Sequence, residues 1–318
     1  MICVAILDTG IEYDNSLKES IITGTGFING LKKDDYRDDN GHGTKCANII
    51  KLYSGNKVKF IIVKVLNEHM EGYEKDILLA LEFLKDYDLD IIHMSLAMKN
   101  SKYVQEFKHL ISYYNKKKVC MIASQYNRTE QICYPAHFEG VLGVKGIKNI
   151  EERSFYYHEK GGLNIEANGV PSLVQTLGGK IELFGGNSKA TALFTGLLGK
   201  YMKTYPDLSV QEILTYFNNN GEPRYHHHVD CTGHVDEGMR GYIKQVKGII
   251  EKVLRLKEIE NQTNLYKMGL NNTNIDKVIK ELSKCYPNLN YQKIFGYYEL
   301  INVFHISYAI YKEREKKT

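Results

Sequence analysis

The sequence lacks an apolar run long enough to cross a bilayer as a helix, which takes about 20 residues. Its first residues show neither the basic region, nor the apolar stretch, nor the cleavage site of a secretory signal. The six cysteines have no paired spacing and lie mostly in apolar runs, as reduced and buried thiols do. These absences argue against a membrane protein and against a disulfide-stapled secreted protein, and they predict a cytoplasmic protein.

The sequence also lacks a strong charge imbalance. Its formal net charge is +4, so charge gives no reason to expect a nucleic acid as partner. With 318 residues, of which 43% are hydrophobic, the chain is large enough to bury a full core. We expect one large domain followed by a smaller one.

Strand-like and helix-like runs alternate through the first part of the sequence. The continuous apolar run at 2–7 is typical of a strand that is buried on both faces, and the segments 58–66 and 119–124 are also strand-like. Apolar residues recur at helical spacing over 77–84 and 107–114. This alternation predicts an α/β domain with a mostly parallel sheet and helices on both faces.

Three polar residues stand where these elements end or begin. Asp8 ends the first strand, where α/β sheets place their sites, although an aspartate there also suits a turn or a helix cap. His42 lies between two glycines at a predicted helix start, where a histidine without a role would face solvent. Ser188 follows a glycine turn and opens a buried helix, either as an ordinary N-cap or as a nucleophile near the positive end of the helix dipole.

Three motifs around these residues resemble the signatures of the subtilisin-like serine proteases. They are Asp8-Thr9-Gly10, Gly41-His42-Gly43-Thr44 and Gly186-Asn187-Ser188-Lys189-Ala190-Thr191, in that family's chain order. The resemblance covers residues 1–245 and implies a subtilisin-like fold and a serine endopeptidase that works through an acyl-enzyme. It assigns Ser188 as the nucleophile, His42 as the general base and acid, and Asp8 as the residue that orients the imidazole.

The oxyanion formed in this chemistry needs two preorganised donors. The resemblance assigns one donor to the backbone N–H of Ser188 and the other to the side-chain amide of Asn127. Gln125 and Tyr126 replace the small residues that are usual just before this asparagine. Gln125 is therefore the alternative donor.

The same resemblance places Ser95, Leu96 and Ala97 at an edge that pairs with the backbone of an extended peptide. Cys133 stands at the expected floor of the pocket for the residue before the scissile bond. It precedes Tyr134 and a proline, and the resemblance implies that the bond between these two is cis. The expected partner is therefore a peptide or protein substrate.

Several features depart from the family. Lys189 stands beside the candidate nucleophile, and we expect it to face solvent. The segment 43–58 is too short for the calcium-binding loop of many secreted members, so we expect no metal and no cofactor. The chain starts seven residues before Asp8, which argues against a propeptide. Residues 226–234 contain four histidines and a cysteine, and they form either a zinc site or a surface loop.

The last part of the sequence predicts a separate all-α bundle. Residues 240–243 resemble the closing strand of the family, which puts the domain boundary after residue 245. In residues 246–318, apolar residues recur at helical spacing in three segments.

Parts of this bundle resemble acyl or peptidyl carrier proteins, over residues 265–275 and 291–295. That family carries its phosphopantetheine arm on a serine that follows an aspartate. Here Asn271 stands at the position of the aspartate and Asn272 at that of the serine. The bundle is then either a degenerate carrier-like domain that docks a biosynthetic partner, or a helical extension that stabilises the protease.

These patterns together predict a selective intracellular serine endopeptidase, which cuts a leader from a biosynthetic peptide precursor. The alternative is a catalytically weak or inactive binding protein on the same scaffold, with the helical domain docking a partner. The Gln125-Tyr126 segment and Lys189 favour the alternative, whereas the complete set of triad residues opposes it.

Overall fold

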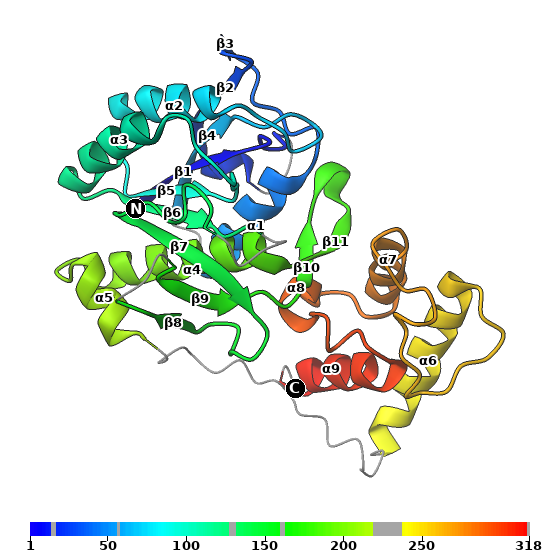
Figure 1. Ribbon diagram of the computed structural model, residues 1–318. Coiled ribbons are helices and arrows are strands. Elements are labelled where there is room, and N and C mark those ends of the chain that lie inside the picture. The colour runs from blue at the N-terminus through cyan, green and yellow to red at the C-terminus, as the bar shows by residue number, and fades with distance from the viewer. Residues whose placement is uncertain (14–16, 56–57, 127–131, 160–162, 219–236, 317–318) are drawn as a thin grey trace. The chain divides into compact units, whose positions relative to one another are not determined.

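The computed structural model describes residues 1–13, 17–55, 58–126, 132–159, 163–218 and 237–316 (Figure 1). The chain divides into two compact units. The first contains residues 1–170, 176–179 and 185–224, and the second contains residues 171–175, 180–184 and 225–318. The second unit is thus more than a C-terminal segment, because it includes two short strands from the middle of the chain.

The first unit is built on a mostly parallel sheet. Its strands are β1 Ile2–Asp8, β2 Ile21–Ile28, β3 Leu31–Lys33, β4 Val58–Lys64, β5 Ile91–Met94, β6 Cys120–Ser124, β7 Val141–Ile147, β8 Phe155–Tyr157 and β9 Ile165–Asn168. Within the described residues, they form one nine-stranded sheet in the order β3-β2-β4-β1-β5-β6-β7-β9-β8. Only the edge strands β3 and β8 run antiparallel to their neighbours.

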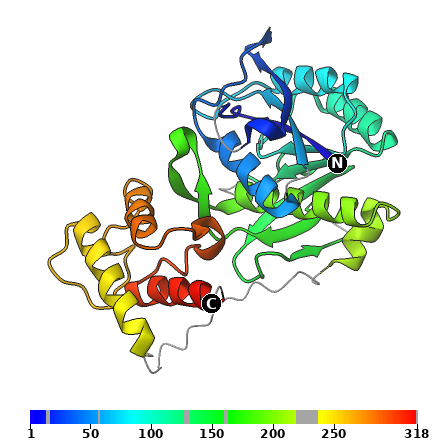
Figure 2. The ribbon, with the colours of Figure 1, turned by 180° about the vertical axis from the view of Figure 1, so that it is seen from behind.

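Helices cover both faces of this sheet. They are α1 His42–Ser54, α2 Glu74–Phe83, α3 Val104–Lys116, α4 Gly186–Thr204 and α5 Val210–Tyr216. α2 and α3 pack together on one face, and α1 and α4 pack together on the other (Figures 1 and 2). The α/β fold predicted from the sequence is therefore confirmed.

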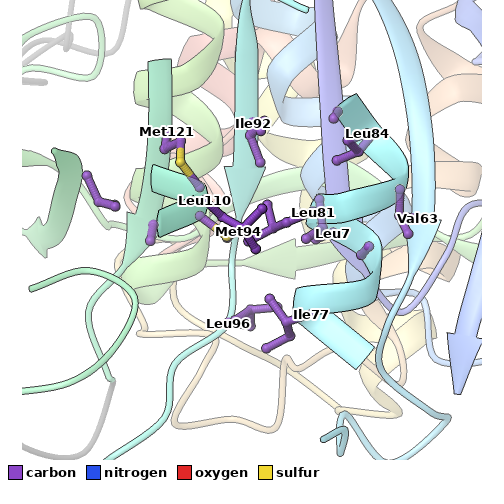
Figure 3. Close-up of a cluster of buried hydrophobic side chains, with 14 of the residues drawn as sticks. Leu7, Val63, Ile77, Leu81, Leu84, Ile92, Met94, Leu96, Leu110 and Met121 are labelled. Carbon is purple, nitrogen blue, oxygen red and sulfur yellow. The ribbon is translucent and has the colours of Figure 1, made fainter. Parts of the chain in front are cut away.

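A large apolar core joins the sheet to α2 and α3 (Figure 3). Leu81 of α2 and Leu110 of α3 are buried against strand residues that include Leu7 and Ile92. Burying one such side chain contributes about 1.5–3 kcal/mol. This core fixes the central strands, and the candidate site lies at the ends of these strands.

The close packing of α1 and α4 depends on Gly196. A Cβ on Gly196 would lie 2.8 Å from both the carbonyl oxygen of Ile50 and the Cβ of Tyr53. Only a residue without a side chain lets the two helices approach this closely. Because α1 begins at His42 and α4 carries Ser188 in its first turn, this contact holds two candidate site residues on one scaffold.

The second unit combines two strands with helices. The elements described in it are β10 Ser172–Gln175, β11 Ile181–Phe184, α6 Glu237–Leu254, α7 Ile275–Cys285, α8 Tyr291–Ile294 and α9 Val303–Glu315. Its core contains buried residues such as Val246, Leu282 and Ile306. The predicted helical region is present. Across the described ranges, no helix is both long and apolar enough to traverse a membrane.

One expectation about the start of this region is wrong. Residues 240–243 lie inside helix α6 and do not form a closing strand. Buried residues Met239, Ile243 and Val246 follow one another at helical spacing, which explains the helix. α6 also runs across residue 245, and the domain boundary expected there stays a prediction.

Candidate active site

Asp8 and His42 meet at the carboxyl edge of the sheet. Asp8 is the last residue of β1 and is buried, and His42 is the first residue of α1. His42 Nδ1 lies 2.7 Å from Asp8 Oδ1. The backbone N–H of Thr9 donates to the same carboxylate oxygen at 2.8 Å. The two side chains thus form a buried carboxylate–imidazole pair.

The Asp8 carboxylate controls the protonation of His42. Burial opposes the charged imidazolium, but the negative charge of Asp8 outweighs it and raises the pKa of His42 well above the ordinary 6.5. In the neutral ring, Nδ1–H donates to Asp8, so the lone pair resides on Nε2. The geometry selects the tautomer in which Nε2 accepts a proton.

A second buried carboxylate, Asp38, ties the turn after β1 to the first turn of α1. Its Oδ1 accepts hydrogen bonds from the Thr9 hydroxyl at 2.8 Å and from Gly41 N–H at 2.7 Å. Its Oδ2 accepts from the N–H and the hydroxyl of Thr44, at 2.9 and 2.7 Å. Burial alone would raise the pKa of Asp38, but these hydrogen bonds outweigh it and lower the pKa. The sequence signal for this residue is a carboxylate shortly before a helix start, which is typical of a capping group.

Gly43 leaves room for the turn that follows Asp8. A Cβ on Gly43 would lie 2.2 Å from the carbonyl oxygen of Gly10 and 3.2 Å from the Cβ of Asp8. Any side chain at this position would push α1 away from β1. The glycine after His42 therefore allows the close approach of α1 to the backbone at Gly10.

Ser188 lies in the first turn of α4 and is 7% exposed. The N-cap of α4 is Gly185, and Gly186 turns the chain with a φ of 79°. This left-handed conformation is one that glycine adopts without strain. Ser188 is therefore not the cap of its helix, and the capping explanation for it is wrong.

Asn187 fixes the backbone just before this serine. Its Oδ1 accepts from Gly146 N–H at 2.8 Å, and its Nδ2 donates to the carbonyl of Gln125 at 3.0 Å. Ser95 Oγ donates to the carbonyl of Ser188 at 3.3 Å. The turn that carries Ser188 is thus bonded to three neighbouring strand ends, those of β5, β6 and β7.

Lys189 is fully buried, so the expectation that it faces solvent is wrong. Its Nζ lies 3.0 Å from Asn168 Oδ1 and 3.6 Å from Glu152 Oε1. The same carboxylate oxygen accepts a hydrogen bond from the hydroxyl of Tyr53. Burial lowers the pKa of Lys189 to about 7. None of these partners neighbours Lys189 in the sequence, so spacing gives no sign of the contact.

The two candidates for the second oxyanion donor differ in what the structure describes. Asn127 lies outside the described residues. Gln125 is buried, and its backbone N–H donates to the carbonyl of Val144 at 2.9 Å, just beyond the end of β6. The choice between these two side chains stays a prediction.

The expected substrate-binding segment directly follows β5. Ser95 and Leu96 are buried, whereas Ala97 is half-buried. The hydrogen bond from Ser95 to Ser188 places the start of this segment next to the candidate nucleophile. Its pairing with an extended peptide stays a prediction.

Tyr134 and Cys133 stand beside this segment. Tyr134 and Met98 exchange two backbone hydrogen bonds, of 2.7 and 2.8 Å. The bond between Tyr134 and Pro135 is cis, as the resemblance implied. Cys133 is buried, and burial raises the pKa of its thiol. A protonated thiol is a suitable wall for an apolar pocket, but its place at the pocket floor stays a prediction.

Potential metal ligands also meet at this site. In the part of the chain that the structure describes, Asp8, His42 and Cys46 have ligand atoms within 4.8 Å of one another. Cys46 Sγ lies 3.9 Å from His42 Nδ1, and burial raises the pKa of the thiol. We interpret the group as a carboxylate–imidazole pair with Cys46 packed beside it, because His42 Nδ1 lies 2.7 Å from Asp8 Oδ1 and the Cys46 sulfur lies farther away. Residues 226–234 lie outside the described residues, and both explanations of their histidines remain open.

Known proteins resemble the first three quarters of the chain. Residues 1–235 match the family model of the subtilase family. The major intracellular serine protease of Bacillus subtilis (strain 168) is 30% identical over 230 residues, which cover 67% of this chain and 71% of the relative. The intracellular serine protease of Paenibacillus polymyxa is 28% identical over 229 residues, covering 67% and 69%. Subtilisin DY of Bacillus licheniformis is 24% identical over 225 residues, covering 66% and 80%. With the fold and the site geometry, these similarities show that the chain belongs to the subtilase family and is a subtilisin-like serine endopeptidase.

Proposed function

We propose that Ser188, His42 and Asp8 carry out the peptidase reaction. The observation that carries this proposal is the buried pair of His42 and Asp8, with 2.7 Å between Nδ1 and Oδ1. Because this pairing leaves the lone pair on Nε2, His42 takes the hydroxyl proton as Ser188 Oγ attacks the substrate carbonyl. Asp8 stabilises the imidazolium that results.

The same imidazolium completes the reaction. It gives its proton to the departing amine, which leaves an acyl-enzyme on Ser188. A water molecule then attacks the acyl group while His42 accepts its proton. The released products are the carboxyl and amino fragments of the substrate, and the enzyme returns to its starting state.

The developing oxyanion requires donors beside Ser188. Its backbone N–H belongs to the first turn of α4, where N–H groups have no partner within the helix, and we assign it as one donor. We assign the side-chain amide of Asn127 as the second donor, with Gln125 as the alternative. Loss of the true second donor lowers kcat by about 10²–10³. Comparing Asn127→Ala with Gln125→Ala identifies that donor, because the other variant keeps most of its activity.

We propose that the substrate is a peptide precursor that is cut selectively inside the cell. Ser95, Leu96 and Ala97 would pair with its extended backbone, and Cys133 and Tyr134 would border the pocket for the residue before the scissile bond. Two of the relatives carry the word "intracellular" in their names, which supports this location. The helical part after residue 235 extends beyond the family match, and we propose that it binds a protein partner in the same process.

Covalent labelling by a fluorophosphonate tests the enzyme directly. We expect the wild type to be labelled and Ser188→Ala not to be, because only the activated serine reacts. A wild type that fails to label in its native state would support the alternative, a binding protein on the same scaffold.

Cleavage of a peptide library, read by mass spectrometry, tests the selectivity. A maturation enzyme cuts few members of the library, at sites that share one sequence feature. Cleavage at many unrelated sites contradicts the proposed role in precursor processing. Ser188→Ala is the control that identifies cleavage by a contaminating protease.

A further inference from the structure

The hairpin of β10 and β11 connects the second unit, along the chain, with the candidate active site. In this hairpin Ser172 pairs with Phe184, and Gln175 pairs with Ile181. The strands belong to the second unit, whereas the tip, Thr176–Gly179, belongs to the first. The chain that leaves β11 at Phe184 reaches Ser188 after three intervening residues.

Side chains of the second unit hold the outer edge of β11. Asn272 Oδ1 accepts from Leu183 N–H at 2.8 Å, and Asn272 Nδ2 donates to the carbonyl of Leu183 at 3.1 Å. Asp276 Oδ1 accepts from Ile181 N–H at 3.0 Å. Asn272 thus satisfies both backbone polar groups of one strand residue, as a neighbouring strand would.

The other edge and the apolar side of the hairpin are held by the same unit. Ser172 forms an antiparallel bridge with Gly296, and Tyr297 N–H donates to the carbonyl of Pro171 at 2.9 Å. Leu173 is fully buried in the core of this unit. The positions of both strands are therefore set by contacts within the second unit.

The tip of the hairpin lies against the residue that precedes His42. Gly178 N–H donates to Glu12 Oε1 at 2.6 Å. A Cβ on Gly41 would lie 2.5 Å from Thr176 Oγ1, so the tip packs directly on the backbone of Gly41. A shift of the hairpin tip would therefore press on the N-terminus of α1.

The exit of the hairpin leads into the turn that presents Ser188. Gly185 has an extended backbone and Gly186 has a φ of 79°. Gly186 N–H donates to the carbonyl of Gly169 at 2.8 Å. Only three residues separate Phe184 from Ser188, so a displacement of β11 acts on the start of α4 through this short stretch of backbone.

We propose that Asn272 and Asp276 are positioning residues for the nucleophile. They hold β11 so that the turn after it presents Ser188 in the reactive orientation. The inference rests on the proposed catalytic role of Ser188. It also explains the asparagine at position 272, where the carrier-protein resemblance has a modified serine, because both polar atoms of its amide bind Leu183.

The variant Asn272→Ala tests this role, with Asn271→Ala as its matched control. Asn271 makes its hydrogen bonds in its own loop, to Thr273 and Gly269. We expect Asn272→Ala to lower kcat at least about tenfold with little change in KM, since small misplacements of reacting groups cost up to about 10² in rate. The rate of labelling by a fluorophosphonate should fall by a similar factor. Asn271→Ala should keep wild-type values for both.

Asp276 gives an independent pair of variants, which decides the question if Asn272→Ala does not fold. Asp276→Asn keeps the acceptor for Ile181 N–H, and we expect it to retain wild-type kcat. Asp276→Ala removes that acceptor and should lower kcat. Melting temperatures are measured in parallel for every variant.

The inference is wrong if both alanine variants melt earlier but keep the wild-type kcat and labelling rate when folded. That result would mean that the hydrogen bonds stabilise the second unit and nothing more. A wild type that does not label contradicts the proposed catalytic role of Ser188 instead. The two failures are therefore distinguishable.

Discussion

The buried pair of Lys189 and Glu152 should stabilise the fold only when both members are present. Lys189 is fully buried, with its Nζ 3.6 Å from Glu152 Oε1. Below about pH 7, where Lys189 is charged, removing one member leaves the other buried charge without its counter-charge, which typically costs about 3–5 kcal/mol. We expect Lys189→Met and Glu152→Gln each to destabilise the protein. The double variant should lose less than the sum of the two, with a coupling of about 1–3 kcal/mol.

The pKa of Lys189 gives this prediction a pH dependence. Burial lowers that pKa from the ordinary 10.5 to about 7 in the folded chain. Between these two values the unfolded chain binds more protons than the folded chain, so the free energy of unfolding rises with pH. From about pH 6 to about pH 8.5, this one group contributes a rise of about 2 kcal/mol. Lys189→Met lacks the group and should lack this contribution.

Urea unfolding at both pH values measures these effects. The chain has no tryptophan, so far-UV circular dichroism is the suitable signal. The wild type, both single variants and the double variant are compared, which cancels the contributions of other titrating groups. Parallel pH dependence of the wild type and Lys189→Met would refute the reasoning, and so would strictly additive losses in the double variant.

Three further predictions concern pH and packing. Because the pKa of His42 lies well above 6.5, kcat/KM for a peptide should fall as the pH drops through that raised pKa, and an acidic limb at or below 6.5 would contradict the pairing. His93 is a fully buried residue of β5. Burial lowers its pKa to about 4, so the folded chain binds fewer protons than the unfolded chain between about pH 4 and 6.5. His93→Asn should then lose about 3 kcal/mol less stability than the wild type between about pH 7 and 4 in urea unfolding, whereas equal losses would exclude this role. In Gly43→Ala the new methyl group would lie 2.2 Å from the Gly10 carbonyl oxygen, so this variant should lose about 1–3 kcal/mol of stability. Gly248 lies in α6 with nothing within 4 Å of the position that a methyl group would take, so Gly248→Ala should stabilise the helix by about 0.5–1 kcal/mol. Similar melting temperatures for these two variants would contradict the packing argument.

The sequence predicts the position of a site residue where that residue ends a strand or begins a helix with a clear apolar pattern. Asp8 ends a continuous apolar run and His42 opens a helix, and the parallel sheet brings the ends of such elements to one edge. Their meeting could therefore be predicted. The strand expected at 240–243 is part of a helix instead, because Met239, Ile243 and Val246 recur at helical spacing and a short likeness to a family motif does not outweigh that period.

Long-range polar contacts had no local signal. Lys189 reaches Glu152 and Asn168, and Leu183 is held by a side chain 89 residues further along the chain. A buried lysine and an exposed one look the same in a sequence when the partner is unknown. The assignment of β10 and β11 to the second unit could not be predicted for the same reason.

β11 precedes α4 in the chain but belongs to the second unit, and this order has a consequence for the newly made protein. A ribosome finishes β11 well before it makes Asn272, which follows Leu183 by 89 residues. At about 5–20 residues per second, this delay is on the order of ten seconds. Throughout it, the strand that leads to Ser188 lacks the side chains that later hold its outer edge. We expect the peptidase to stay latent until Asn272 and Asp276 have been made and can bind β11, so that an unfinished chain does not digest itself or its neighbours.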